Sequence, residues 1–115
     1  MVLPKYTHIW DCCCDHGLLG AALLSRQAAA NIHFVDQVPE LITELEGKLN
    51  RFFTDSASTW HTHCLDVANL PLDNHTHNTA DKHLIIIAGV GGDLMAQLVR
   101  SIRQNNQVTQ IDFLL

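Results

Sequence analysis

Residues 9–24, IWDCCCDHGLLGAALL, decide the fold that we expect for this chain. They begin as a short apolar strand that ends at Asp11, pass through a tight polar loop and continue as a helix rich in alanine and leucine. A strand that turns directly into a helix presents free N–H groups and the positive end of the helix dipole to the loop. Such a turn is a common place for a small anionic or zwitterionic ligand, but many α/β proteins have one without a ligand.

The composition indicates a single domain. The chain has 115 residues, and 47% of them are hydrophobic, which is enough apolar surface for a buried core. It contains no run of about 18 apolar residues, and its N-terminus lacks the build of a signal peptide, so we expect a cytoplasmic protein that does not contact a membrane. The net charge of −5 and the scattered lysines and arginines argue against a nucleic-acid-binding surface spread over the chain.

Three of the four cysteines, Cys12, Cys13 and Cys14, are consecutive. Neighbouring cysteines form a poor disulfide framework, which fits a reducing compartment. We interpret them as small apolar side chains that fill the turn after the strand, in preference to metal ligands.

Beyond this stretch, apolar strands alternate with amphipathic helices. Strands are predicted at residues 6–11, 31–36, 60–65, 81–88 and 108–115, and helices at residues 18–29, 39–53 and from 93 to the asparagine pair 105–106. Residues 69–80 read as a loop, and Leu19, Ala22 and Leu23 are expected to face the sheet. This order predicts an α/β fold, with a Rossmann-like, doubly wound parallel sheet of about five strands and flanking helices.

In such a sheet, ligands bind outside the carboxyl ends of the strands, where the strand order reverses. Four predicted strands deliver a polar group or a glycine to that edge, namely Asp11, Asp36, Asp66 and Ala88-Gly89. Asp36 follows Gly17 by 19 residues, close to the spacing of about 20 expected for an acid that binds ribose hydroxyls. A single acid at a strand end often only caps the next helix. Three such acids, with a glycine loop after the fourth strand, favour a ligand site.

Two motifs carry a resemblance to a known family. The sequence DCCCDH at residues 11–16 is similar to D-x-G-S-D-H, and IIAGVGG at residues 86–92 is similar to I-A-G-M-G-G. Together they resemble the class I S-adenosylmethionine-dependent methyltransferases, and among these the bacterial tRNA adenine N1-methyltransferases that act at position 22 of tRNA. The resemblance covers nearly all of the chain and implies that residues 1–115 are the N-terminal part of such a methyltransferase domain.

The resemblance implies S-adenosylmethionine as the cofactor and assigns residues to its parts. The methionine part would be surrounded by residues of the first loop, which are Asp11, Cys13, Asp15, His16 and Gly17. Asp36 would bind the ribose hydroxyls, with Gln37 beside it. Asp66 would face the adenine amino group, and Val67 would offer its backbone N–H to the ring. Ala88 and Gly89 would line the wall near the sulfonium. Gly91 and Gly92 would leave room for the incoming base.

The sequence departs from the family pattern at several places. Cys13 stands where the family has glycine, so a side chain there would crowd the cofactor unless the thiol points away. The helix that precedes the first strand in the family, the strands after the fifth and the C-terminal helical extension have no counterpart in these residues. We therefore expect an incomplete class I methyltransferase fold from a longer protein, inactive or weak in cofactor binding alone, that binds tRNA through regions outside this chain.

The expected reaction needs little acid–base assistance, because a sulfonium is already an activated electrophile and N1 of adenine has a lone pair. Positioning and exclusion of water would supply most of the rate. Asp15 and His16 are candidates to accept the proton lost from the methylated base, but the sequence identifies no catalytic residue.

Three alternatives stay open. The first is a truncated or non-catalytic cofactor-binding domain. The second is a metal-binding module built from His61, His63, Cys64, His75 and His77. It is disfavoured because Cys64 would face away from the two strand histidines, so no metal site is expected. The third is a nicotinamide-binding domain, disfavoured because the first loop lacks the G-x-G-x-x-G pattern.

Overall fold

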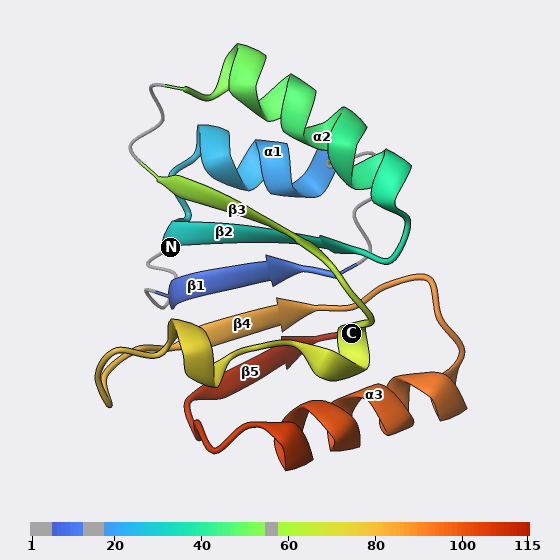
Figure 1. Cartoon of the computed structure of the whole chain (residues 1–115). Coiled ribbons are helices and arrows are strands. Elements are labelled where there is room, and N and C mark those ends of the chain that lie inside the picture. The colour runs from blue at the N-terminus through green and yellow to red at the C-terminus, as the bar shows by residue number, and fades with distance from the viewer. Residues whose placement is uncertain (1–5, 13–17, 55–57) are drawn as a thin grey trace.

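Five parallel strands form one sheet in the computed structural model, which describes residues 6–12, 18–54 and 58–115, leaving aside the side chains of residues 18 and 19. The strands are β1 (Tyr6–Asp11), β2 (Ala29–Asp36), β3 (Thr59–Cys64), β4 (His83–Ile86) and β5 (Ile111–Leu114), in the order β3-β2-β1-β4-β5. Helices α1 (Leu18–Ser25) and α2 (Pro39–Phe52) lie beside the β2-β3 half, and α3 (Gly92–Asn105) lies beside the β4-β5 half (Figure 1). The predicted fold class is confirmed.

The two faces of the sheet have separate hydrophobic cores, because successive side chains of a strand point to opposite faces. Ile9 belongs to the core under α1 and α2, whereas its neighbour Trp10 belongs to the core on the other face. The first core also contains Leu24, Ile32, Phe34, Leu45 and Leu49. The second also contains Val35, Leu70, Leu72, Ile85, Ile87, Ile102 and Ile111. Both faces are therefore covered, as expected for a parallel sheet.

Helix α1 is shorter than predicted. The chain leaves it through Gln27, whose φ of 51° lies in the left-handed region. The N–H of Gln27 donates to the carbonyl of Leu24, and the N–H of Ala28 donates to that of Leu23, both at 3.0 Å. This pair of hydrogen bonds closes a helix before a left-handed residue. Strand β2 consequently starts at Ala29, earlier than predicted, and the prediction that the helix continues to residue 29 is wrong.

The predicted packing face of α1 is confirmed at Leu23 and wrong at Ala22, while the side chain of Leu19 lies outside the described residues. Leu23 packs against the first core as expected, but Ala22 is exposed, and the most buried leucine described in α1 is Leu24. Gly20 is buried one turn before Leu24, with the ring of Phe34 directly against its backbone. The absence of a side chain at Gly20 therefore sets which face of α1 meets the sheet.

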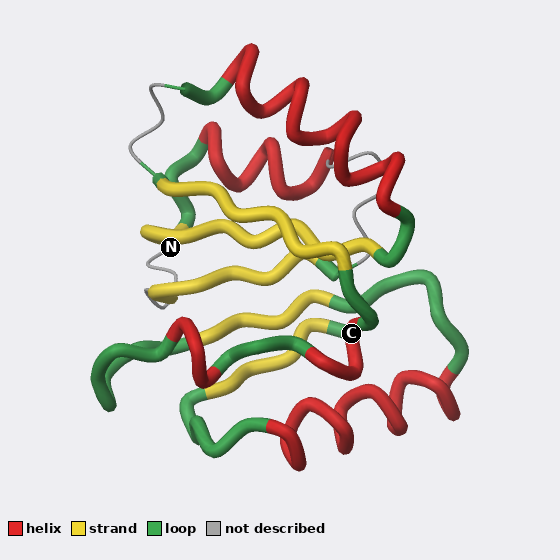
Figure 2. The backbone as a smooth tube through the Cα atoms, in the orientation of Figure 1, coloured by secondary structure: helices red, strands yellow, loops and turns green. Residues whose placement is uncertain are grey.

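The segment between β3 and β4 covers the second face of the sheet without forming an α-helix. It contains only two short 3-10 turns, η2 (Val67–Asn69) and η3 (Asp73–His75), which the tube in Figure 2 shows within a long connection. The carboxylate of Asp73 accepts hydrogen bonds from the N–H groups of Gln107 at 2.8 Å and Val108 at 3.0 Å. These bonds tie the segment to the chain after α3. None of the helices in the described ranges is long and apolar enough to cross a bilayer.

Candidate functional site

A cavity of about 950 Å³ opens at the carboxyl ends of the strands. Strands β1 and β4 are neighbours at the point where the strand order reverses, which is the usual ligand position in such sheets. The cavity is lined by residues that follow or end four strands, including Cys12, Asp36, Gln37, Leu65, Asp66, Val67, Ile87, Ala88 and Gly89. Its volume lies within the range of sites for small molecules and cofactors.

Asp36 is the last residue of β2 and stands in the cavity wall. Its Oδ1 accepts a hydrogen bond from the N–H of Val38 at 2.9 Å, which shapes the turn into α2. Gln37 also lines the cavity, and its carbonyl accepts a hydrogen bond from the thiol of Cys64 at 3.5 Å. The ends of β2 and β3 are thus held side by side, with the Asp36 carboxylate at the cavity.

Asp66 repeats this arrangement after β3. Its Oδ1 accepts a hydrogen bond from the N–H of Ala68 at 2.9 Å and caps η2. Asp66 and Val67 both line the cavity. A local structural role and a ligand contact are therefore compatible for both acids. Asp36 shapes the turn before α2 and Asp66 caps η2, while both stand in the cavity wall.

Asp11 occupies a different position from the other two acids. It is buried, with 1% of its surface exposed, and its Oδ2 accepts a hydrogen bond from the N–H of Gly20 in α1 at 3.1 Å. The described cavity wall includes its neighbour Cys12 but not Asp11 itself. The contact seen for Asp11 is therefore with the first turn of α1, and its predicted cofactor contact stays a prediction.

The loop after β4 forms the far wall. Ala88 and Gly89 line the cavity, and Gly89 has a φ of 77°, a conformation that glycine adopts readily. Gly91 and Gly92 lie at the start of α3, outside the described lining. A Cβ atom on either glycine would have no atom within 4 Å, so the space beside them is open, and their predicted place beside the acceptor base stays a prediction.

Four predicted cofactor-binding residues, Cys13, Asp15, His16 and Gly17, lie outside the described residues. Their predicted roles, including the effect of a cysteine where the resembled family has glycine, stay predictions.

The parts of the wall that come from helices were not predicted from the sequence. Val38, Leu41 and Leu94 line the cavity and are 43%, 40% and 46% exposed, which is high for side chains of their size and polarity. They stand at the starts of α2 and α3, beyond the edge of the sheet, where no core covers them. Apolar residues in the first turn of a helix that follows a strand are the signal that would have identified them.

The charge of the cavity is predominantly negative. Among the described lining residues, Asp36, Glu44 and Asp66 are acidic, and Lys48 is basic. Lys48 lies 3.8 Å from Glu44 on the outer face of α2, as predicted, and both side chains are about half exposed. Such an exposed pair stabilises the fold little. A wall with this balance favours a ligand that carries positive charge and disfavours the pyrophosphate of a dinucleotide.

Three members of the alternative metal set, His61, His63 and His75, lie close together, whereas neither Cys64 nor His77 belongs to the described group of potential ligands. His61 and His63 share one face of β3, as predicted, while Cys64 bonds to Gln37 at the cavity edge. His77 is exposed. Three histidines from different elements, His33, His63 and His75, converge on the covered face of the sheet.

Comparison with known proteins identifies the family to which the chain belongs. No curated protein is significantly similar to the chain. The family model described as "Methyltransferase domain" matches residues 1–115, which is the whole chain. The parallel sheet with reversed strand order and the cavity at its carboxyl edge agree with that match. The chain belongs to the methyltransferase domain family.

Proposed function

We propose that this domain binds S-adenosylmethionine in the cavity at the carboxyl edge of the sheet and transfers its methyl group to N1 of an adenine in tRNA. The observation that carries the proposal is the placement of Asp36 and Asp66, at the ends of adjacent strands, in the wall of one cavity. Family membership supports the methyl transfer, and the negative wall suits a cationic cofactor.

In this proposal, different residues of the cavity bind different parts of the cofactor. The Asp36 carboxylate accepts hydrogen bonds from the two ribose hydroxyls, which a carboxylate at this position is suited to do. Asp66 accepts a hydrogen bond from the adenine amino group, and the N–H of Val67 donates to the ring. The apolar side chains of Leu65 and Leu98, which also line the cavity, cover the faces of the adenine.

The chain positions the acceptor and excludes water. When bound, the cofactor supplies a methyl group on a positively charged sulfur, which is a good leaving group. The chain would hold the nucleoside part of the cofactor through Asp36 and Asp66, so that the methyl group could pass to N1 of the adenine while the bonding electron pair remains on sulfur. The open space beside Gly91 and Gly92 would admit the base. Alignment of the two reactants supplies most of the acceleration.

The identity of the acceptor rests on the resemblance of the 86–92 stretch, and the RNA contact is assigned to regions outside this chain. The net charge of −5 supports that assignment, because RNA binding depends on basic surface. The corresponding test is methylation of tRNA transcripts followed by mass spectrometry of the nucleosides. Appearance of 1-methyladenosine supports N1 of adenine as the acceptor atom. A methyl group found on another atom would identify that atom as the acceptor and would leave the proposed cofactor site unaffected.

Cofactor binding is tested by calorimetry with S-adenosylmethionine, S-adenosylhomocysteine and NAD. We expect heat of binding from the first two only. The variant Asp36→Ala should lose affinity by about 10- to 100-fold, since a hydrogen bond to a charged group contributes about 1.5–3 kcal/mol. Asp36→Asn keeps an oxygen that can accept the hydrogen bond from the N–H of Val38, so the turn stays intact and only the contact with the ribose is weakened. Its loss of affinity should therefore be smaller than that of Asp36→Ala.

Glu40→Ala is the matched control, because Glu40 is an exposed acid in the first turn of α2 that does not line the described cavity. It should bind like the unaltered protein. Full affinity in Asp36→Ala, or tighter binding of NAD than of S-adenosylmethionine, would contradict the proposed site.

A further inference from the structure

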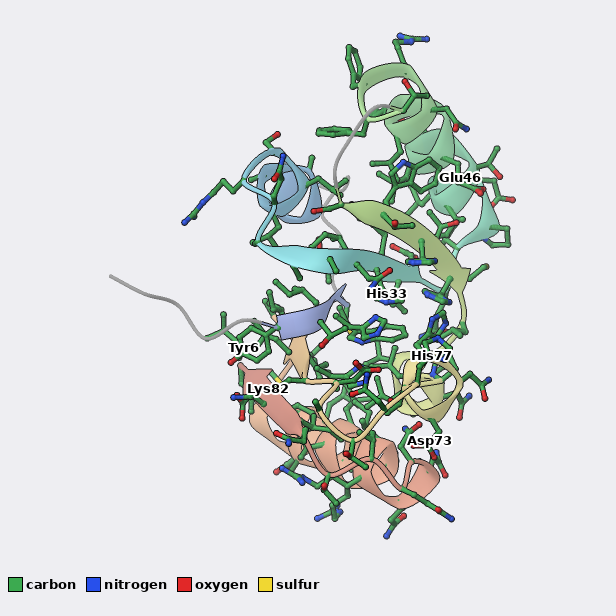
Figure 3. All side chains as sticks on the ribbon, turned by 90° about the vertical axis from the view of Figure 1, so that its left-hand side faces the viewer. Tyr6, His33, Glu46, Asp73, His77 and Lys82 are labelled. Carbon is green, nitrogen blue, oxygen red and sulfur yellow. The ribbon has the colours of Figure 1, made fainter. Side chains whose placement is uncertain are left out.

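Six histidines gather on the face of the sheet that residues 67–82 cover. Five come from strand positions that share this face, and the sixth comes from η3; they are His8, His33, His61, His63, His83 and His75. Ring centroids lie 5.0 Å apart for His8 and His33, 4.6 Å for His33 and His61, and 5.1 Å for His33 and His63. Figure 3 shows His33 in the interior, and His77 on the covering segment. A core with only a packing role is normally built from apolar side chains.

Three of these histidines point ligand atoms at a common space. One ring nitrogen each from His33, His63 and His75 lies within 4.8 Å of the others, and no other described group of three or more potential ligands does so. Nδ1 of His33 and Nε2 of His63 are 2.9 Å apart. The ring of His75 stands at 77° to that of His33 and at 90° to that of His63. Two ligands of a tetrahedral zinc ion lie about 3.3 Å apart, so a small outward shift of these rings admits an ion.

The imidazoles are neutral, as metal ligands must be. Burial is the main cause that lowers the pKa of His33 far below its usual range, and neighbouring histidines add to it. Burial likewise lowers the pKa of His63 to about 4. The pKa of His75 is lowered by burial first and then by His61 and His77. All three rings therefore offer a lone pair near neutral pH.

The second nitrogen of His33 has the partner that a metal-bound histidine needs. Its Nε2 lies 2.8 Å from Nδ1 of His8. With the proton on Nε2 and donated to His8, the Nδ1 lone pair of His33 is directed at His63. Such an outer hydrogen bond fixes the tautomer and orientation of a ligating histidine.

His75 is the member whose position is hardest to explain without an ion. Its ring contacts the rings of His8, Trp10, His33, His61 and His63. Within the described part of the chain, that ring makes no hydrogen bond, whereas the rings of His8, His33, His61, His63 and His83 each make at least one. A half-buried imidazole held edge-on to two others is therefore available to a ligand that bridges them.

We propose that His33, His63 and His75 bind one divalent transition-metal ion, with zinc as the first candidate. Three imidazoles from β2, β3 and η3 occupy three positions of a tetrahedron and leave the fourth to water, a ligand set that zinc accepts. The ion fastens the segment between β3 and β4 to the sheet on the face that also carries Cys12 and Val35 in the cavity wall.

The test is metal binding by the whole protein after removal of metal with a chelator. Zinc is titrated by calorimetry, and cobalt(II) is used as a probe because four-coordinate cobalt absorbs visible light far more strongly than six-coordinate cobalt. We expect one zinc ion per chain and the intense four-coordinate cobalt spectrum.

The informative variant is His75→Ala, because His75 is half-buried in a short turn and its removal leaves the strands intact. Removing a partner outside the ligand shell typically lowers metal affinity by about 10- to 100-fold, so loss of a ligand should lower it at least as much. His77→Ala is the matched control, since His77 is an exposed neighbour outside the cluster, and it should bind zinc like the unaltered protein.

Four results would overturn the proposal, and the first three concern the zinc stoichiometry, the His75→Ala variant and the cobalt spectrum. These are no stoichiometric binding of zinc to the chelator-treated protein, unchanged affinity in His75→Ala, or a six-coordinate cobalt spectrum. Zinc binding that His77→Ala abolishes would also overturn it, because the ion would then be held on the covering segment. Each of these readouts is independent of methyl transfer, so they leave the proposed function untouched.

Discussion

A Cβ atom built on Gly20 would overlap Cε1 of Phe34, whose ring is fully buried under α1. The variant Gly20→Ala must therefore push α1 away from β2 or force Phe34 out of its rotamer. We expect the free energy of unfolding to fall by about 1–3 kcal/mol, the usual cost of overfilling a packed core. Urea unfolding followed by circular dichroism measures it.

Gly47→Ala is the matched control for that variant. Gly47 is exposed inside α2, and a Cβ there would meet no atom within 4 Å. Alanine at such a position should raise the free energy of unfolding by about 0.5–1 kcal/mol. If both alanine variants change stability in the same direction, close packing does not explain Gly20.

Gln27 holds a left-handed conformation at the end of α1, with a φ of 51°. A side chain in this region is strained by about 1–2 kcal/mol, and glycine is not. Gln27→Gly should therefore stabilise the protein by up to about 1 kcal/mol, the greater freedom of glycine in the unfolded chain offsetting part of the gain. Gln27→Ala keeps the Cβ atom and should not stabilise it. Thermal unfolding of the two variants side by side distinguishes these outcomes.

The stability of the protein should decrease in mild acid because of His83. The indole N–H of Trp10 donates to its Nδ1 at 3.0 Å, so the proton of His83 is on Nε2, which donates to the hydroxyl of Thr76 at 2.8 Å. Protonation of Nδ1 would place its N–H against the indole N–H of Trp10, so the hydrogen bond between them would be lost. Burial, partly offset by the charge of Asp81, lowers the pKa of His83 to about 4.

Whether stability rises or falls with pH depends on which state of the protein, folded or unfolded, binds more protons. His83 titrates near its ordinary pKa of about 6.5 in the unfolded chain, so the unfolded chain binds more protons between about pH 6.5 and pH 4. Lowering the pH from about 7 to about 5.5 should cost about 1 kcal/mol through His83 alone, and the other buried histidines add to the loss. Urea unfolding in the presence of a chelator measures it. In His83→Asn, whose Oδ1 still accepts from Trp10, a pH dependence as steep as before would refute this assignment.

Asp73 fastens the covering segment to the chain after α3 through the N–H groups of Gln107 and Val108. Asp73→Ala should lower the free energy of unfolding by about 1–2 kcal/mol, since both hydrogen bonds involve a charged acceptor but lie at the surface. Asn74→Ala, at the exposed neighbouring position, should change it little. Hydrogen exchange at Gln107 and Val108 offers a direct check, and unaltered protection in Asp73→Ala would contradict the role.

Much of the fold was predictable because apolar runs and strand-end acids are local signals. The bounds of β1 were predicted to the residue, and Pro39 starts α2 where expected. The end and the packing face of α1 were not predicted. Gln27 gives no sequence sign of a left-handed residue, and the role of Gly20 depends on Phe34, which belongs to another element.

For the site, the residues at the strand ends were predictable from the sequence and the histidine cluster was not. Asp36, Asp66 and Gly89 meet at one cavity because parallel strands deliver their carboxyl ends to one edge, a rule that the sequence pattern already invokes. The histidine cluster could not be predicted in the same way. His33 and His63 become neighbours only through the register of β2 against β3, and His75 reaches them from a segment with no periodic pattern.

The strand order places the two sides of the proposed site on opposite sides of the β1-β4 pair. The residues assigned to the nucleoside follow β2 and β3, while the open approach beside Gly91 and Gly92 follows β4 on the other side of the reversal. Under the proposed assignment, substitutions after β4 would alter the acceptor side of the cavity and leave the strand ends assigned to the nucleoside unchanged. The sheet would thus let the choice of acceptor vary independently of how the methyl donor is held.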